Sequence, residues 1–80
     1  MTRDEVYKRL NEVFRDVFDD DSIVLNDSTV ADDVDGWDSF EHINLIVAVE
    51  KEFSFKIPMG KVVTMKNVGE MVDIILQMGK

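Results

Sequence analysis

The first group of apolar residues follows helical spacing. Thr2 followed by Glu5 fits a capping box, in which the two residues satisfy each other's backbone amides. The apolar residues after this box lie three or four positions apart: Val6, Leu10, Val13, Phe14 and Val17. Residues at this interval share one face of a helix. The pattern therefore predicts a first helix from about Asp4 to about Phe18.

The following segment, residues 19–37, is polar and rich in Asp, Ser, Asn and Gly. These residue types favour turns, because glycine adopts left-handed backbone and the short polar side chains bond to nearby backbone groups. Only four apolar residues stand out as anchors: Ile23, Val24, Leu25 and Val30. We predict a long loop that these four side chains fasten to the core, and loops of this length are commonly functional.

Asp38 is a good helix N-cap, and no Gly or Pro occurs from Ser39 to Phe53. This composition predicts a second helix over Ser39–Phe53. The helix is apolar on two sides. One side consists of Leu45, Ile46, Val49 and Phe53, and the other of Phe40, Ile43 and Val47. A helix apolar on two sides is either enclosed or binds a partner, and full enclosure is difficult in so small a protein.

The rest of the chain predicts two further helices. Ile57-Pro58 permits a new helical start, and a short third helix or turn should reach about Met65, weakened by Gly60. Asn67 can cap a last helix with Gly79 near its end, and its apolar face is Val68, Met71, Val72 and Ile75. No alternating strand pattern is present. We therefore predict an all-α fold, a small four-helix bundle with a long first loop and a short third helix, as a single domain over residues 1–80.

Charge and length narrow the possible partners. With 17 acidic and 9 basic residues among 80, the net charge of −8 repels nucleic acid and anionic lipid headgroups, so we expect protein partners with basic patches. The longest apolar run, Leu45–Val49, is far shorter than the roughly 20 residues of a membrane span. The first residues show no apolar signal segment. We expect a cytoplasmic monomer that binds no nucleic acid and has no membrane span.

Ser39 is a candidate for modification because of its place at the first turn of the second helix. Unpaired backbone amides and the positive end of the helix dipole suit a phosphate at this point. Taken alone, however, Asp38-Ser39 is more often a plain helix start, because both residue types are favoured there.

The residues around Ser39 favour neither a catalytic site nor a metal site. His42 follows Ser39 by three positions without an evident orienting acid, so a serine hydrolase is not expected, and His42 is interpreted as a partly buried packing residue. Placing Gly36 at the sixth position of a calcium loop puts Ala31 first and His42 twelfth, and neither is a suitable ligand there. We therefore predict no catalytic residue and no metal site, and we interpret the Asp cluster as a solvated loop.

Four segments together resemble the acyl carrier protein family over nearly the whole chain. They are Gly36-Trp37-Asp38-Ser39-Phe40, Glu50-Lys51-Glu52-Phe53, Ile57-Pro58, and Val68-Gly69-Glu70-Met71-Val72-Asp73-Ile74-Ile75. Phe40 stands where this family usually has Leu. The resemblance implies that a phosphopantetheinyl transferase attaches a 4'-phosphopantetheine arm from coenzyme A to Ser39, with Asp38 helping to position the transferase complex. The arm's thiol would carry acyl groups, so the chain would be a carrier and not an enzyme. The absence of cysteine agrees with this, because the arm supplies the only thiol.

The resemblance also makes the second helix the recognition helix. Its predicted partner contacts are Phe40, Glu41, Ile43, Val47 and Glu50. The partners it implies are the transferase and acyl-transferring, condensing or ligase enzymes. Trp37 is interpreted either as a cover for the arm or as the anchor of the loop.

Several residues depart from the carriers of primary fatty acid synthesis. His42, Asn44 and Lys51 dilute the negative charge of the second helix, and Met59-Gly60-Lys61 stands where many such carriers have acidic residues. We therefore expect service in a specialised fatty acid, polyketide or related pathway. An aminoacyl or peptidyl carrier and a cofactor-free acidic helical adaptor are the alternatives.

Overall fold

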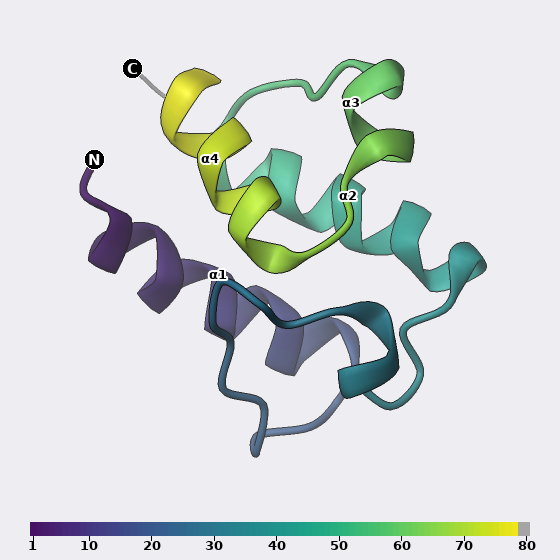
Figure 1. Ribbon diagram of the computed structural model, residues 1–80. Helices are drawn as coiled ribbons and strands as arrows, with labels where there is room; N and C mark the ends of the chain where they lie inside the picture. Colours follow the sequence, from purple (N-terminus) through teal and green to yellow (C-terminus); the bar gives the residue numbers. More distant parts are fainter. Residues whose placement is uncertain (79–80) are drawn as a thin grey trace.

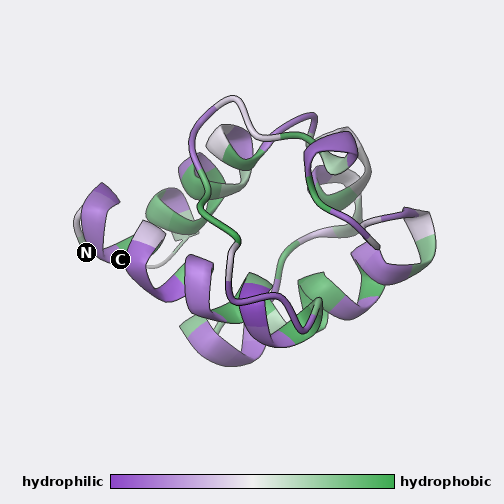
Figure 2. Cartoon of the chain, turned by 90° about the horizontal axis from the view of Figure 1, so that it is seen from below, coloured by the Kyte–Doolittle hydropathy of each residue, from purple (hydrophilic) through white to green (hydrophobic). Residues whose placement is uncertain are grey.

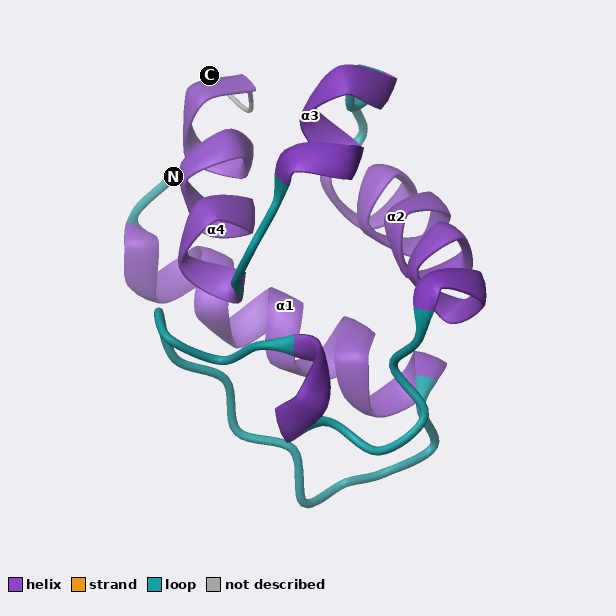
Figure 3. Cartoon of the chain, turned by 45° about the vertical axis from the view of Figure 1, so that its right-hand side comes forward, coloured by secondary structure: helices purple, strands orange, loops and turns teal. Residues whose placement is uncertain are grey.

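The computed structural model describes residues 1–78, which form four α-helices and one short 3-10 helix (Figure 1). In chain order the elements are α1 (Arg3–Val17), η1 (Ala31–Asp33), α2 (Ser39–Phe53), α3 (Met59–Thr64) and α4 (Val68–Met78). Over these residues the helices are joined by loops alone and no strand occurs (Figure 3). The predicted all-α bundle, with its long first loop and short third helix, is confirmed. Gly79, expected near the end of the last helix, lies outside the described residues.

The helix starts follow from side chains that cap backbone amides. The capping box of Thr2 and Glu5 is present, and α1 begins and ends one residue before the predicted positions. The Asp38 carboxylate accepts from the Glu41 amide at 2.8 Å, and α2 has the predicted bounds. Asn67 caps α4 as predicted, accepting from the backbone amide three residues later at 2.9 Å. Each cap satisfies an amide that has no partner within its helix.

The core lies between α1, α2 and α4, since α1 packs against both of the other helices. Hydrophobic and hydrophilic stretches alternate along the helices in Figure 2, as in amphipathic helices. The inner side of α2 is buried as predicted: Leu45, Ile46, Val49 and Phe53. So is the predicted face of α4: Val68, Met71, Val72 and Ile75. No helix within residues 1–78 is long and apolar enough to cross a bilayer.

The four predicted loop anchors have different outcomes, and Val30 is only partly buried and is not one of the side chains packed against the core. Ile23 and Leu25 are buried, but Val24 between them is 73% exposed. Successive side chains of an extended segment point to opposite sides, so two neighbours of Val24 can face the core only if Val24 faces solvent. Val34, which we did not predict, is buried instead, at 7% exposure.

Polar contacts fix the long loop to α1. The Arg15 guanidinium donates from Nε to the Ile23 carbonyl at 2.8 Å, and the Leu25 amide donates to Asn11 Oδ1 at 2.9 Å. These two bonds hold the loop backbone on either side of Val24, in the extended form that buries Ile23 and Leu25.

The same loop is fixed to the start of α4. The Val68 amide donates to the Thr29 carbonyl at 2.8 Å, and the Gly69 amide donates to the Asp27 carbonyl at 3.0 Å. Gly69 is required for this approach, because a Cβ there would lie 2.7 Å from the Asp27 carbonyl oxygen. The first turn of α4 thus uses the loop's carbonyls to satisfy amides that have no partner within the helix.

Side chains of α1 complete this junction. Arg3 pairs with Asp27 and Asp73, both at 2.8 Å, and the Tyr7 hydroxyl donates to the Asp27 carboxylate. The bond from Tyr7, followed by that from Arg3, lowers the pKa of Asp27 below its ordinary value. Partial burial, followed by the bond to Asp27, raises the pKa of Tyr7 to about 12.

The connection after α2 is built differently. Ser54 ends α2 in the left-handed region, with φ 61°, and Pro58 precedes α3. Among the side chains that the structure describes in this segment, Ile57 and Val62 are buried. The predicted short third helix therefore exists, over fewer residues than we expected.

Candidate functional site

Ser39 is the first residue of α2, and its side chain is exposed. The Asp38 carboxylate is occupied by the Glu41 amide, as its capping role requires. Among the described residues, the amides of Ser39 and Phe40 donate to no protein acceptor. Two unpaired amides at the positive end of a helix suit an anion next to the Ser39 hydroxyl.

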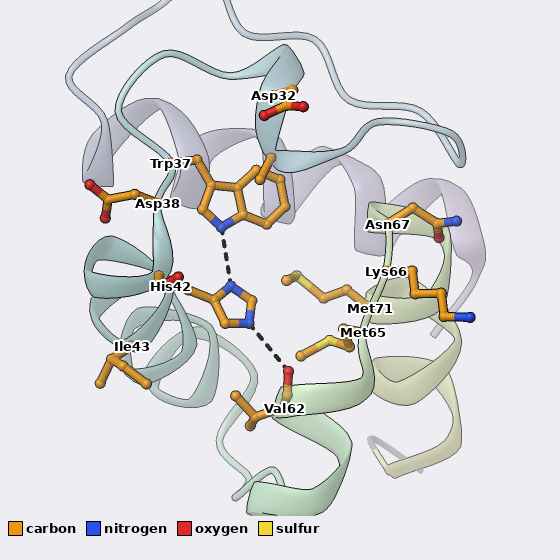
Figure 4. A pocket seen from close by; sticks show the side chains of 12 residues that line it. Asp32, Trp37, Asp38, His42, Ile43, Val62, Met65, Lys66, Asn67 and Met71 are labelled. Carbon is orange, nitrogen blue, oxygen red and sulfur yellow. Dashed lines mark hydrogen bonds between the residues drawn. The ribbon is translucent and has the colours of Figure 1, made fainter.

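A cavity of about 610 Å³ opens beside Ser39, between the loop, α2, α3 and α4 (Figure 4). Its apolar lining includes Ile43, Val62, Met65 and Met71, and Lys66 and Asn67 lie on the side of α4. Methionine side chains are unbranched and flexible, so such a lining adapts to groups of different shape.

A chain of hydrogen bonds crosses the wall of this cavity (Figure 4). Trp37 Nε1 donates to His42 Nδ1 at 3.1 Å, and His42 Nε2 lies 3.4 Å from the Val62 carbonyl oxygen. Because Nδ1 accepts, the imidazole proton is on Nε2, which donates to Val62. The chain links the loop, α2 and α3. His42 is thus a half-buried structural residue, in agreement with its interpretation from the sequence.

Trp37 anchors the loop. Its ring packs edge-on against Phe14 of α1, with centroids 5.1 Å apart, and it lies nearly parallel to the His42 ring, with centroids 5.9 Å apart. The anchoring interpretation therefore accounts for its position, and the same ring forms one edge of the cavity.

The second apolar side of α2 is open to solvent. Phe40, Ile43 and Val47 are 81%, 52% and 45% exposed. Glu41 is half-buried near the start of this surface, where its carboxylate accepts from Asn44 at 3.2 Å. The side of α2 that we predicted to contact partners is therefore accessible along most of its length.

Glu50 has a role that the sequence did not indicate. Its Oε2 accepts from the Ile57 amide at 2.7 Å, and its side chain is only 15% exposed. This carboxylate fastens the connection after α2 to the helix, so we leave it out of the partner surface proposed below. The bond spans seven positions across a turn, and no local pattern marks it.

The residues that α4 and the connection before it contribute to the cavity were not predicted from the sequence. Met65, Lys66 and Met71 lie far from Ser39 in the chain and come together with it only through packing. Within residues 1–78, no group of three or more His, Cys, Asp or Glu side chains is placed to hold a metal ion.

No protein-family model matches the chain. Over 77 residues it is 32% identical to the acyl carrier protein of Petrotoga mobilis, an alignment that covers 94% of this chain and 88% of that protein. The chain belongs to the acyl carrier protein family. It is also 31% identical over 80 residues to the mitochondrial acyl carrier protein of Saccharomyces cerevisiae, and the match covers 94% of this chain and 63% of the yeast protein.

A solved structure agrees with the family. The solution structure of holo acyl carrier protein from Geobacter metallireducens superimposes with a TM-score of 0.84 at 44% identity, covering 90% of this chain and 83% of that one. The family predicted from the sequence is confirmed, together with its fold and its cofactor, 4'-phosphopantetheine. The attachment of the arm to Ser39 and the partner contacts on α2 stay predictions.

Proposed function

We propose that this acyl carrier protein holds acyl groups as thioesters on a 4'-phosphopantetheine arm attached to Ser39. One observation supports this residue above all others. Its exposed hydroxyl lies at the first turn of α2, beside two unpaired amides and at the edge of the cavity. Phosphopantetheine joins the chain through a phosphodiester, which is the kind of anion that such a helix start stabilises.

The chain's own residues divide the work around the arm. The amides of Ser39 and Phe40 are placed to donate to phosphate oxygens. Asp38 caps the N-terminus of α2 by accepting from the Glu41 amide. The cavity lined by Met65 and Met71 is the place we propose for the part of the acyl group nearest the arm. The chain would perform no reaction itself.

The proposed partners are a phosphopantetheinyl transferase and acyl-transferring, condensing or ligase enzymes, all contacting the exposed side of α2. Phe40, Ile43 and Val47 would provide apolar contact, with Glu41 at their acidic end. We propose a specialised fatty acid, polyketide or related pathway, because Lys51 and Lys61 stand where carriers of bulk synthesis are more acidic. A single monomeric carrier domain in the cytoplasm is the simplest setting for this role.

Intact mass after incubation with coenzyme A and a broad-specificity transferase tests the proposal. The protein should gain one phosphopantetheine, Ser39→Ala should gain none, and the control Ser28→Ala, at an exposed serine of the loop, should still gain one. Because Ser39 is exposed, its replacement should change stability by only about 0.5 kcal/mol or less.

An unmodified wild-type protein, under conditions that load a control carrier, would leave the cofactor-free acidic adaptor as the better account. For a loaded protein, subsequent charging by an acyl-activating or an aminoacyl-activating enzyme separates an acyl carrier from an aminoacyl or peptidyl carrier. A loss of helicity in Ser39→Ala would instead make Ser39 a structural residue.

A further inference from the structure

The net negative charge of the chain belongs entirely to the part before α2. Residues 1–38 contain 12 acidic and 4 basic side chains, whereas residues 39–80 contain 5 of each. Asp32, Asp35 and Asp38 are exposed, and two of them, Asp32 and Asp38, line the cavity together with Ser39. A partner that approaches the exposed side of α2 therefore meets an acidic region at the Ser39 end.

The far end of α2 is basic. Lys51 lies one turn after Val47 and so continues the exposed side of the helix. Lys56 follows α2 and is 92% exposed, and Lys61 is exposed on α3. Among residues 1–78, Lys51 and Lys61 form no ion pair. Their charge is therefore available to an incoming group.

The acidic residues near these lysines are occupied by other contacts. Glu52 pairs with Arg9 of α1 at 2.8 Å, with both side chains 40% exposed. Glu50 accepts from the Ile57 amide, and Lys56 reaches its other oxygen only at 4.0 Å. Because Glu50 is mostly buried and the charge of Glu52 is paired with Arg9, the lysines carry the unpaired charge at this end of α2.

A hollow of about 300 Å³ lies beside two of these lysines, Lys51 and Lys56. The left-handed turn at Ser54 brings Phe55 beside Val47, and Phe55 stacks against Phe53 with centroids 6.3 Å apart. Val47 and Phe55 form its apolar lining, and its polar lining is Glu50, Lys51, Ser54 and Lys56, so the two lysines outnumber the single carboxylate. It continues the apolar surface of Phe40, Ile43 and Val47 along α2.

We propose that partner enzymes bind α2 in one direction only, with a basic region over the Ser39 end and an apolar side chain flanked by carboxylates in the hollow between Val47 and Phe55. This inference rests on the proposed carrier function. Lys51 follows Ser39 by about three turns, so at 1.5 Å per residue the two partner regions are about 18 Å apart. Reversed docking would place like charges together at both ends of α2, and this repulsion specifies the orientation.

Two other occupants fit the surface less well. An anionic membrane would be attracted by the lysines but repelled by the acidic end of the same helix and the loop before it. A second copy of this chain would bring two net charges of −8 together. An enzyme surface with both signs of charge satisfies both ends of α2.

Peptide binding tests the inference without depending on the arm. We would use Ser39→Ala protein labelled with ¹⁵N and three amphipathic peptides of about four helical turns. The three peptides have leucine at the same positions. One peptide has Lys at one end and Glu at the other, one has only Lys, and one has only Glu. Because the apo variant is used throughout, failed loading at Ser39 and failed directional docking give separate results.

The mixed peptide should bind about fivefold more tightly than either uniform peptide, because it adds exposed ion pairs at both ends. Its Glu end should shift the amides of Val47, Lys51 and Phe55. Combining Lys51→Glu with Lys56→Glu should weaken the mixed peptide by about fivefold and strengthen the all-Lys peptide. The control Lys8→Glu, at an exposed position of α1, should change neither.

Equal binding of all three peptides, or an unchanged ranking after the double charge reversal, would overturn the inference. Shifts confined to other helices would do the same. Light scattering at the titration concentration must show a monomer. If it shows a dimer that the Lys51→Glu substitution dissociates, the surface binds a second copy of this chain and the inference is wrong.

Discussion

The two long connections of the bundle, residues 18–38 and residues 54–67, are held in place by different means. The first contains only η1, yet its backbone bonds to both α1 and α4, and Thr29 within it is buried at 6% exposure. The second contains α3, yet its side-chain hydrogen bonds to α2 are those from Ile57 to Glu50 and from His42 to Val62, over the described residues. The part with less regular structure is therefore the more firmly attached.

This contrast indicates which wall of the cavity moves. A helix of six residues has little stability of its own and depends on its packing. Segments with few buried contacts open at low free energy, and binding sites draw on such segments. We expect α3 to shift when the cavity is filled, while the loop and α4 keep their places.

Two glycines give the largest expected difference between the connections. Gly69→Ala places a Cβ 2.7 Å from the Asp27 carbonyl oxygen, so the loop must leave α4, and we expect a loss of about 2 to 3 kcal/mol in unfolding free energy. Gly60→Ala in α3 meets nothing within 4 Å and should stabilise the protein by about 0.5 to 1 kcal/mol. Urea unfolding followed by circular dichroism measures both. Equal midpoints for the two variants would show that the loop is not fixed at Gly69.

Replacing His42 tests the weaker attachment. His42→Phe keeps an aromatic ring beside Trp37 but removes the bonds to Trp37 and to the Val62 carbonyl, and we expect a loss of about 1 kcal/mol. Hydrogen exchange of α3 amides should accelerate, while the Val68 and Gly69 amides, bonded to the loop, should exchange as before. Uniform acceleration along the chain would mean that α3 does not open separately.

The junction of Asp27 and Tyr7 gives the smallest effect, visible only at the extremes of pH. The lowered pKa of Asp27 contributes stability above its ordinary value of 3.8, and this contribution is lost as the pH falls through the lowered value. The raised pKa of Tyr7 contributes stability that is complete below pH 10 and lost as the pH rises towards about 12.

Melting temperatures across the pH range measure these two contributions. Asp27→Asn should reduce the loss on the acid side, and Tyr7→Phe should reduce the loss on the alkaline side. If the melting temperature of both variants depends on pH as in the wild-type protein, the junction does not contribute to the pH dependence of stability.

The sequence predicted those features that depend on neighbouring residues. The bounds of α2 follow from one cap and a run without Gly or Pro, and its buried side follows from the spacing of Leu45, Val49 and Phe53. Ser39 was predicted as the attachment residue from the Asp38-Ser39 pair together with the wider resemblance to acyl carrier proteins, and this stays a prediction. The prediction that Val24 is buried was wrong, because the direction of a loop side chain depends on the hydrogen bonds that Arg15 and Asn11 make to the loop backbone.

The site beyond Ser39 could not be predicted in the same way. The inward turn of Glu50 depends on where the connection after α2 places the Ile57 amide. The cavity depends on how α3 and α4 bring Met65 and Met71 towards α2. Both are results of packing between distant segments, and the spacing of residues along the chain does not encode them directly.

Trp37 has a practical consequence for following this carrier in solution. It is the sole tryptophan of the chain, and its indole lies at the edge of the cavity with its N–H bonded to His42. Indole emission responds to the polarity and hydrogen bonding of its surroundings, so the protein contains its own fluorophore at the place where cargo would enter. Arrival and release of an acyl group can then be timed by stopped-flow fluorescence without a label on either molecule.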